Sequence, residues 1–515
     1  MKNIISIKDL SIAEIDELLR GAEYMQKIII NPFLMKKMWE MTYPKNPLKP
    51  KITLFFAESS TRTRGSFSEA ARRLNFDCYE ISGAEATSLT KKESLADTAR
   101  MFASKNQGAD ILAIRTNIEG APRFTAEILD KMNCDTAIIN AGDGMNQHPT
   151  QALLDLFTIS KHFERKNIPD LTIGFMGDLA YSRVAHSDLL LFRLLGVKKI
   201  RLISVPETKI QTKYKDGFTE IIESEDIKTL SDCDIIIALR VQEERYADPV
   251  KREAIKGKFR ITPENINLFK KEAIIMHPLP NPMNTGEIDP HLYDYNKGPR
   301  VVVHEQAANG IPVRMQLLWQ SYQQRYFKNN CQNLSTVTFE KIREESAKEC
   351  LEKQKNKKME FFRPIDPEIG TGIIIDHLPL GQGIIVQSLL EKTLGDNILP
   401  IHTIKGVSSS KYGQKDVVIM ENNCVAIENN DLLAAISLIY GEKITLHIIK
   451  DKMYRKFKLN PPTIIQKLLA CPNPNCVTRH EPEAMTCFYN TFPDLGIVEC
   501  AYCEREFPSE DLKPI

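Results

Sequence analysis

The segment KITLFFAESSTRTRGSFSEAARRL, residues 51–74, joins an apolar run to a turn rich in hydroxyl and guanidinium groups and then to a helical pattern. Its first six residues are typical of a strand buried on both faces. Free backbone amides and the positive end of the helix dipole face whatever lies above such a turn. The turn residues add donors that suit a phosphate, although serine and threonine also cap helices and arginine is often only solvated. These turn residues are Ser60, Thr61, Arg62, Thr63 and Arg64.

Apolar runs of the same kind recur on the C-terminal side of this segment and alternate with helical patterns such as residues 182–195. The runs are residues 109–115, 135–140, 171–177, 198–204, 233–239 and 272–277. This alternation predicts an α/β architecture with two doubly wound parallel-sheet domains. Ligands of such sheets bind beyond the carboxyl ends of the strands, so the turn after each strand is where reactive side chains are expected.

Length and charge limit the classes of function. A chain of 515 residues is expected to hold about three or four domains. The formal net charge is +1, so no global field draws the protein to nucleic acid or to an anionic membrane, and neither partner is expected. Acidic residues from Asp9 to Glu17 interrupt the apolar stretch that a signal peptide needs, and no run reaches the ~18 apolar residues of a membrane span. The sequence therefore predicts a soluble cytoplasmic protein.

The composition changes after about residue 321. Residues 321–360 are highly charged and lack an aliphatic stripe, which predicts a helical or partly disordered linker. Strand-like runs then alternate with two helical patterns, which predicts a small α+β domain. The runs are residues 372–379, 416–423 and 443–450, and the helical patterns are residues 382–394 and 430–439.

Five of the eleven cysteines crowd into the last part of the chain. Two pairs, Cys471 with Cys476 and Cys500 with Cys503, have the spacing of a structural zinc site, in which four thiolates surround one ion. Cys487 lies between the pairs and is expected to be a bystander, as is His480. A tail with so little apolar content needs a bound metal ion of this kind to fold. Zinc modules also bind nucleic acid, but this tail has no basic stripe.

Several segments within the first 325 residues carry a resemblance to a known family. STRTR at residues 60–64 follows a strand, HPTQ occupies residues 148–151, and Arg115 ends an apolar run. Together these features resemble the aspartate and ornithine carbamoyltransferases. Residues 88–102 resemble the family's mobile loop, which enters the neighbouring subunit's active site and implies a homotrimer or a multiple of trimers. Residues 304–320 resemble the helix that returns to the first domain.

The resemblance implies a role for each matching side chain. Thr63, Arg115 and His148 would polarise the carbonyl of carbamoyl phosphate, and Arg62 joins them as a catalytic group. Gln151 and the backbone around Leu279 would hold its amide. The full set implied for carbamoyl phosphate is Ser60, Thr61, Arg62, Thr63, Arg115, His148, Gln151 and Leu279. Donors aimed at the developing negative charge make a protein nucleophile unnecessary, and neither a catalytic metal nor an organic cofactor is implied.

The acceptor follows from the second half of the chain. Arg183 and Arg240 each follow an apolar run, and two guanidiniums suit a ligand with two carboxylates, although arginines near strand ends are usually solvated. Both match the aspartate enzymes, as does Gln242, and Ser88 and Lys92 of the loop would complete the aspartate site. Ornithine carbamoyltransferases resemble one another in having a cysteine at the position that Pro278 occupies in this chain. L-Aspartate is therefore favoured, while other dicarboxylic amines stay open.

The C-terminal part resembles the regulatory chain of aspartate carbamoyltransferase. CPNPNC and CAYCE are similar to its zinc domain, and residues 373–379 and 415–422 to its nucleotide-binding domain. Asp376, His377 and Lys456 match nucleotide-contacting residues. A second lysine of that site appears here as Ile419. Loss of an ammonium that pairs with an anion weakens binding, so we predict an altered or absent response to nucleotide effectors.

These features together predict two carbamoyltransferase domains followed by a ferredoxin-like α+β domain and a small zinc-binding β domain. The expected boundaries are residues 1–147 for carbamoyl phosphate, 148–325 for aspartate, 326–362 for the linker, 363–465 for the nucleotide-binding type domain and 466–515 for zinc. The expected activity is carbamoylation of L-aspartate in pyrimidine synthesis. A carbamoyltransferase with another acceptor and a nonenzymatic assembly or nucleic-acid-binding protein on the same scaffold remain the alternatives.

Overall fold

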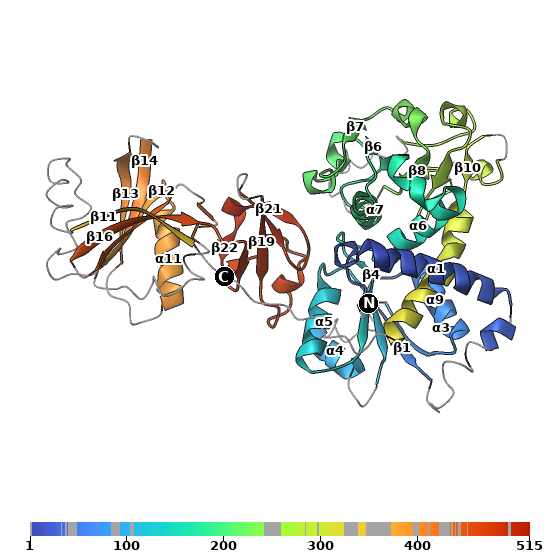
Figure 1. Cartoon of the computed structure of the whole chain (residues 1–515), viewed down its shortest axis with the longest axis horizontal. Coiled ribbons are helices and arrows are strands. Elements are labelled where there is room, and N and C mark those ends of the chain that lie inside the picture. Colours follow the sequence, from blue (N-terminus) through green and yellow to red (C-terminus); the bar gives the residue numbers. More distant parts are fainter. Residues whose placement is uncertain are drawn as a thin grey trace. The chain divides into compact units, whose positions relative to one another are not determined.

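The protein divides into two compact units, Met1–Asn329 and Asn330–Ile515 (Figure 1). The computed structural model describes residues 3–31, 33–36, 39, 49–83, 93–103, 108–241, 259–283, 285–295, 298–323, 338–346, 372–394, 401–409, 413–421, 433, 436–437, 439–440, 444–450, 452–492 and 496–515. Among these residues, no helix combines the length and the apolar character that crossing a membrane requires.

The first sheet of the N-terminal unit has four parallel strands in the order β2-β1-β3-β4. The strands are β1 (Lys51–Phe56), β2 (Asp77–Ser82), β3 (Ile111–Thr116) and β4 (Ala137–Asp143). Helices α3 (Thr61–Arg73), α4 (Leu95–Ala103) and α5 (Ala121–Lys131) connect them. Because β1 and β3 are buried along most of their length, they appear in the sequence as continuous apolar runs.

The second sheet has six parallel strands in the order β10-β9-β8-β5-β6-β7. The strands are β5 (Thr172–Gly177), β6 (Lys199–Ile203), β7 (Glu220–Ser224), β8 (Ile235–Leu239), β9 (Ile274–Met276) and β10 (Arg300–Val301). Helix α6 (Pro149–His162) leads from the first sheet to this one, and α7 (Arg183–Leu194) follows β5. Two parallel sheets confirm the predicted α/β architecture of this unit.

The long helix α9 (Val303–Gln323) ties the two sheets together. It packs against α6 and also against α3 and α1 (Ile12–Ile29), and Figure 1 shows it running from the second sheet to the first. A capping box between Ser11 and Glu14 begins α1. One apolar core includes residues of all four helices and of both sheets. This confirms the predicted helix at residues 304–320, which returns to the first sheet.

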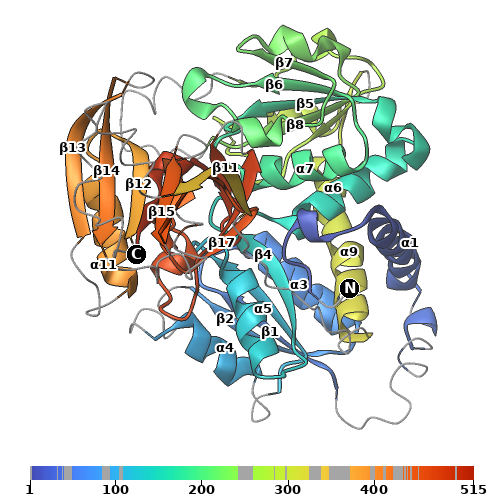
Figure 2. The same ribbon diagram turned by 60° about the vertical axis from the view of Figure 1, so that its left-hand side comes forward.

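The C-terminal unit contains a six-stranded antiparallel sheet in the order β11-β16-β15-β12-β14-β13. The strands are β11 (Thr338–Ser346), β12 (Gly372–Pro379), β13 (Ile401–Ser409), β14 (Gly413–Glu421), β15 (Thr445–Lys450) and β16 (Met453–Asn460). Helix α11 (Gly383–Leu394) packs against β13 and β14 (Figure 2). The sheet and its helix confirm the α+β class predicted for this part.

One segment differs from its predicted secondary structure. Strand β11 lies within residues 326–362, which the sequence predicted to be a helical or partly disordered linker. It pairs with β16 over most of its length and forms an edge of the sheet. The charges that indicated a linker suit such an edge strand, because charged side chains discourage pairing with another chain.

The last fifty residues form a separate small sheet of antiparallel strands. Its order is β17-β19-β20-β21, formed by Ile464–Gln466, Cys487–Phe492, Ile497–Cys500 and Glu506–Pro508. A two-stranded ribbon joins β18 (Leu469–Ala470) to β22 (Lys513–Pro514). Short strands in a small module confirm the β character predicted for the tail.

Candidate active site

The turn after β1 presents unsatisfied donors, as its sequence predicted. Ser60 is the N-cap of α3, but its side chain makes no capping hydrogen bond. Its hydroxyl is therefore available to a ligand rather than used by the helix. Burial lowers the pKa of Arg62 from its ordinary value, so its guanidinium lies in a partly desolvated setting. Arg64, two residues on, is paired instead with Glu80 at 3.7 Å.

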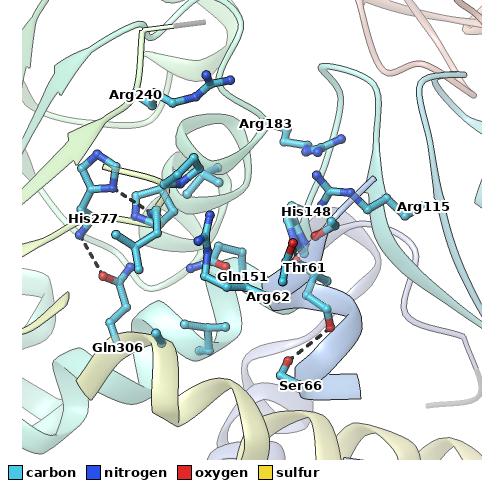
Figure 3. Close-up of a pocket in the computed structure, with 18 of the residues that line it drawn as sticks. Thr61, Arg62, Ser66, Arg115, His148, Gln151, Arg183, Arg240, His277 and Gln306 are labelled. Carbon is cyan, nitrogen blue, oxygen red and sulfur yellow. Dashed lines mark hydrogen bonds between the residues drawn. The ribbon is translucent and has the colours of Figure 1, made fainter. Parts of the chain in front are cut away.

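A cavity of about 820 Å³ opens beside this turn and extends to the second sheet (Figure 3). Every described residue that the family resemblance assigned to a substrate lines it. They are Ser60, Thr61, Arg62, Thr63, Arg115, His148, Gln151, Arg183, Arg240 and Leu279. These residues lie at the carboxyl ends of β1, β3, β4, β5, β8 and β9, in the last residues of a strand, in the following turn or in the first turn of the next helix. Ser88, Lys92 and Gln242 lie outside the described residues.

His148 lies at the junction predicted from the following proline, because Pro149 begins α6. Its ring nitrogens lie 3.5 Å from the hydroxyls of Thr63 and Thr150, and its backbone N–H donates to Ser187 at 2.8 Å. Burial, reinforced by the charge of Arg115 and other nearby arginines, lowers its pKa well below the ordinary histidine value. The imidazole is therefore neutral at pH 7 and suited to donating a hydrogen bond rather than a proton.

Glu58 links two guanidiniums of the cavity. Its carboxylate accepts from Arg183 at 2.9 and 3.2 Å and lies 3.7 Å from Arg115. The lack of a side chain at Gly142 leaves room for the Arg183 guanidinium, because a Cβ at this position would lie 3.0 Å from it. The φ of Gly142 is +117°, which also favours glycine. The sequence analysis did not identify Glu58, although it immediately precedes the polar turn. Its position holds both guanidiniums over the cavity.

Arg314 is a cavity residue that the sequence analysis also missed. It is 3 % exposed, donates to Ser66 at 2.7 Å and to Thr150 at 3.3 Å, and lies over the ring of Phe67. Burial lowers its pKa to about 10, so it remains charged at neutral pH. An arginine within a helical pattern usually indicates a solvated face, and only the packing of α9 against α3 shows otherwise. It adds a further positive charge to the cavity.

The turn after β9 is fixed by a buried histidine. The Leu279 N–H donates to His277 Nδ1 at 2.8 Å, so Nε2 carries the ring proton and donates to Glu287 at 3.0 Å. The backbone N–H of His277 donates to Gln306 Oε1 at 2.8 Å (Figure 3). Leu279 has a φ of +61°, which is unfavourable for a leucine and persists because these bonds hold it.

The cysteine cluster has the geometry of a metal site. Cys471, Cys476, Cys500 and Cys503 are all buried, and their sulfur atoms lie within 4.8 Å of one another. Two of the sulfur pairs are 3.8 Å apart, close to the edge of about 3.8 Å expected for a tetrahedron with metal–sulfur bonds of about 2.3 Å. Cys487 and His480 are not in the cluster, as predicted.

The residues matched to a nucleotide site lie on β12 and β16, the two strands that flank β15 in the antiparallel sheet. Asp376 accepts from Lys415 at 2.6 Å and from the His377 N–H at 2.7 Å, and its pKa is well below the usual range although burial opposes this. Lys456 pairs in register with His447 beside them. The sequence analysis did not identify Lys415 or His447. Ile419 is fully buried in an apolar cluster, so no cation occupies that position.

Family models match nearly the whole of the first unit and most of the second. Residues 2–161 match the carbamoyl-P binding domain of aspartate/ornithine carbamoyltransferase, and residues 169–321 match its Asp/Orn binding domain. Residues 367–460 match the allosteric domain of the aspartate carbamoyltransferase regulatory chain, and residues 463–513 match its metal binding domain.

Curated and solved proteins resemble the first unit. The aspartate carbamoyltransferase catalytic subunit of Sulfurisphaera tokodaii is 36% identical over 319 residues, which cover 61% of this chain and 97% of the relative. That of Archaeoglobus fulgidus is 38% identical over 325 residues, 62% and 98% of the two chains. The solved catalytic subunit of M. jannaschii aspartate transcarbamoylase is 34% identical with a TM-score of 0.51, covering 63% and 98%. The Trypanosoma cruzi enzyme bound to N-(phosphonacetyl)-L-aspartic acid is 28% identical with a TM-score of 0.52, covering 62% and 95%.

Proposed function

Because this chain belongs to the aspartate/ornithine carbamoyltransferase family, we propose that it transfers the carbamoyl group of carbamoyl phosphate to the amine of L-aspartate. The products are N-carbamoyl-L-aspartate and phosphate, as in pyrimidine synthesis. One observation carries this proposal: a single cavity gathers guanidiniums from both halves of the first unit. They are Arg62, Arg115, Arg183, Arg240 and Arg314. Two anionic substrates repel each other, and these charges allow them to bind side by side.

Carbamoyl phosphate binds at the turn of β1 in this proposal. Ser60, Thr61 and Arg62 hold the phosphate with the free amides of α3, and Arg115 reaches it from β3. Thr63, Arg115 and His148 donate to the carbonyl oxygen, where negative charge develops as the amine attacks. The lowered pKa of His148 supports this role, because a neutral imidazole donates without losing its proton. Gln151 and the Leu279 backbone hold the amide.

Aspartate binds on the side of the second sheet. Arg183 and Arg240 receive its two carboxylates, and Gln242 with the loop residues Ser88 and Lys92 completes the site. Because that loop acts across subunits in the family, the working form is a homotrimer or a multiple of trimers. Pro278 stands beside Leu279 in the cavity, where a thiol would favour ornithine.

Assays of phosphate release with carbamoyl phosphate and either L-aspartate or L-ornithine test the proposal. We expect aspartate-dependent release, with kcat/KM for aspartate exceeding that for ornithine by roughly a hundredfold or more, because Arg183 and Arg240 select two carboxylates. Release that needs no acceptor, or that prefers ornithine, would contradict it. Identification of carbamoyl-aspartate by mass spectrometry excludes simple hydrolysis.

The cysteine cluster holds one structural zinc ion per chain in this proposal. Four buried thiolates with these sulfur distances suit zinc, and they fit a reducing compartment such as the cytoplasm. The ion would close the fold of the last residues and take no part in catalysis. The allosteric-domain match, together with the Asp376–His377 pair on β12 and Lys456 on β16, supports binding of a nucleotide effector at this unit.

The response to that effector is expected to be weak. Where the family has a second lysine, Ile419 lies in an apolar cluster and offers no partner to a nucleotide. Aspartate saturation curves with and without CTP or ATP measure the effect, and we expect the midpoint to shift by less than about twofold, below the usual range of allosteric coupling. A fivefold or larger shift would show that other residues replace the missing ammonium.

A further inference from the structure

A buried carboxylate, Asp155, lies behind the wall of the cavity. It is on α6, one turn after Gln151, and is 0 % exposed. Its Oδ1 accepts from Gln151 Nε2 at 2.9 Å and from Gln306 Nε2 at 2.6 Å. Gln306 comes from α9, so one oxygen atom joins two glutamine amides from two helices.

These bonds fix which end of each amide faces which way. A carboxylate oxygen that accepts from both amides requires nitrogen on its side, so each amide oxygen points away from Asp155. For Gln306 that oxygen receives the His277 N–H at 2.8 Å. For Gln151, which lines the cavity, the oxygen is left for a ligand. Oδ1 of Asp155 accepts these two bonds whether or not the carboxyl group is protonated. Oδ2 has no partner among the described residues, so it can carry the proton.

The chain of bonds continues from Gln306 to the turn after β9. The His277 ring accepts from the Leu279 N–H at 2.8 Å and is anchored to Glu287 at 3.0 Å. Gln151 and the Leu279 backbone are the two groups proposed to hold the carbamoyl amide. Within the described part of the chain, Asp155 connects both of them through consecutive hydrogen bonds.

We propose that Asp155 is a positioning residue that makes the site select a carbamoyl donor over an acyl donor of the same shape. This inference rests on the proposed function. Held by Asp155, Gln151 presents an acceptor to the amide hydrogens of carbamoyl phosphate. Acetyl phosphate has the same phosphate and carbonyl but a methyl group in place of the amide, and it leaves that acceptor unpaired. Unpaired polar groups in a buried site are the strongest source of such discrimination.

The test is the ratio of the dissociation constants of acetyl phosphate and carbamoyl phosphate, each measured by competition against inorganic phosphate. In Asp155→Leu both amides lose their acceptor, and we expect the ratio to fall by roughly tenfold or more while affinity for inorganic phosphate stays within about twofold. Asp155→Asn is expected to keep the wild-type ratio, because its amide oxygen can accept from both glutamines. This rescue by the conservative variant separates positioning from a loss of charge.

Asp188 supplies a matched control. It is also fully buried, on α7, and neither of its carboxyl oxygens has a hydrogen-bond partner among the described residues. Burial and the nearby Asp155 raise the pKa of Asp188 well above its ordinary value. Asp188→Leu therefore removes a group that acts on Asp155 only through charge and makes no hydrogen bond to Gln151 or Gln306, and we expect it to keep the ratio. Gln306→Leu breaks the same chain of bonds at another point and is expected to lower the ratio, which keeps the test available if Asp155→Leu does not fold.

Three results would overturn the inference: an unchanged ratio in Asp155→Leu or in Gln306→Leu with inorganic phosphate still bound, an equal fall in Asp155→Asn, or an equal fall in Asp188→Leu. The ratio is a binding quantity and needs no acceptor. A wild-type protein that discriminates between the two donors but does not carbamoylate aspartate would therefore refute the proposed function and leave this inference standing.

Discussion

Replacement of Arg62 by alanine is expected to lower kcat by on the order of a thousandfold, with little change in thermal stability. Its guanidinium lines the cavity at the first turn of α3, where the phosphate is proposed to bind. There it stabilises the charge that accumulates as phosphate leaves. Within the described part of the chain no hydrogen bond ties this side chain to the fold, so its removal should affect the reaction far more than the free energy of unfolding. Steady-state rates with carbamoyl phosphate and aspartate measure the loss.

The same helical turn provides the control. Arg64 is also an arginine of α3, but it pairs with Glu80 and does not line the cavity. Arg64→Ala removes the same charge from the same helix, and we expect kcat to change by less than about threefold, as for an exposed ion pair. Equal losses in the two variants would show that the protein needs only the general positive charge of α3. The proposed phosphate contact would then be wrong.

Replacement of Cys500 by serine is expected to abolish metal binding and unfold the last fifty residues. A structural zinc ion contributes on the order of 10 kcal/mol to the folding of such a module, which is comparable to the whole stability of an ordinary domain. The small antiparallel sheet is built around the cluster, since β20 ends at Cys500 itself. Metal content per chain and hydrogen exchange of β19 and β20 measure the effect.

Cys487→Ser is the matched control for this prediction. Cys487 begins β19 and is partly exposed, but its sulfur is not part of the cluster. We expect this variant to keep one metal ion per chain and the slow exchange of the wild type. Retention of the metal and of protected amides in Cys500→Ser would mean that the cluster does not stabilise the fold of this part of the chain.

The buried elements were predictable because their physical signal is strong. β5 and β8 are buried along their full lengths, so each appears in the sequence as a largely apolar run that is typical of a central strand. β7 is an edge strand with mostly exposed side chains, and its apolar and polar residues do not alternate in a way that distinguishes it from a loop. β11 is another edge, and its charged residues indicated a linker instead.

The site residues that could be predicted were likewise those with a strong local signal in the sequence. Residues in turns after predicted strands were found, because parallel strands bring those turns to one edge of a sheet. Arg314 was missed because it reaches the cavity from the interior of α9, and only the packing of that helix reveals its side chain as buried. The contacts of Asp155 also depend on the meeting of two helices, α6 and α9, and no local pattern distinguishes it from a solvated aspartate.

The central claim is that one cavity binds carbamoyl phosphate and aspartate together. N-(phosphonacetyl)-L-aspartic acid, the ligand of the solved Trypanosoma cruzi enzyme, joins features of both substrates in one molecule. Calorimetric titration with this compound tests the claim most directly. We expect one molecule to bind per chain, more tightly than carbamoyl phosphate and in competition with it, with affinity reduced in both Arg62→Ala and Arg183→Ala. Absence of binding, or binding that leaves carbamoyl phosphate able to bind as before, would contradict the claim.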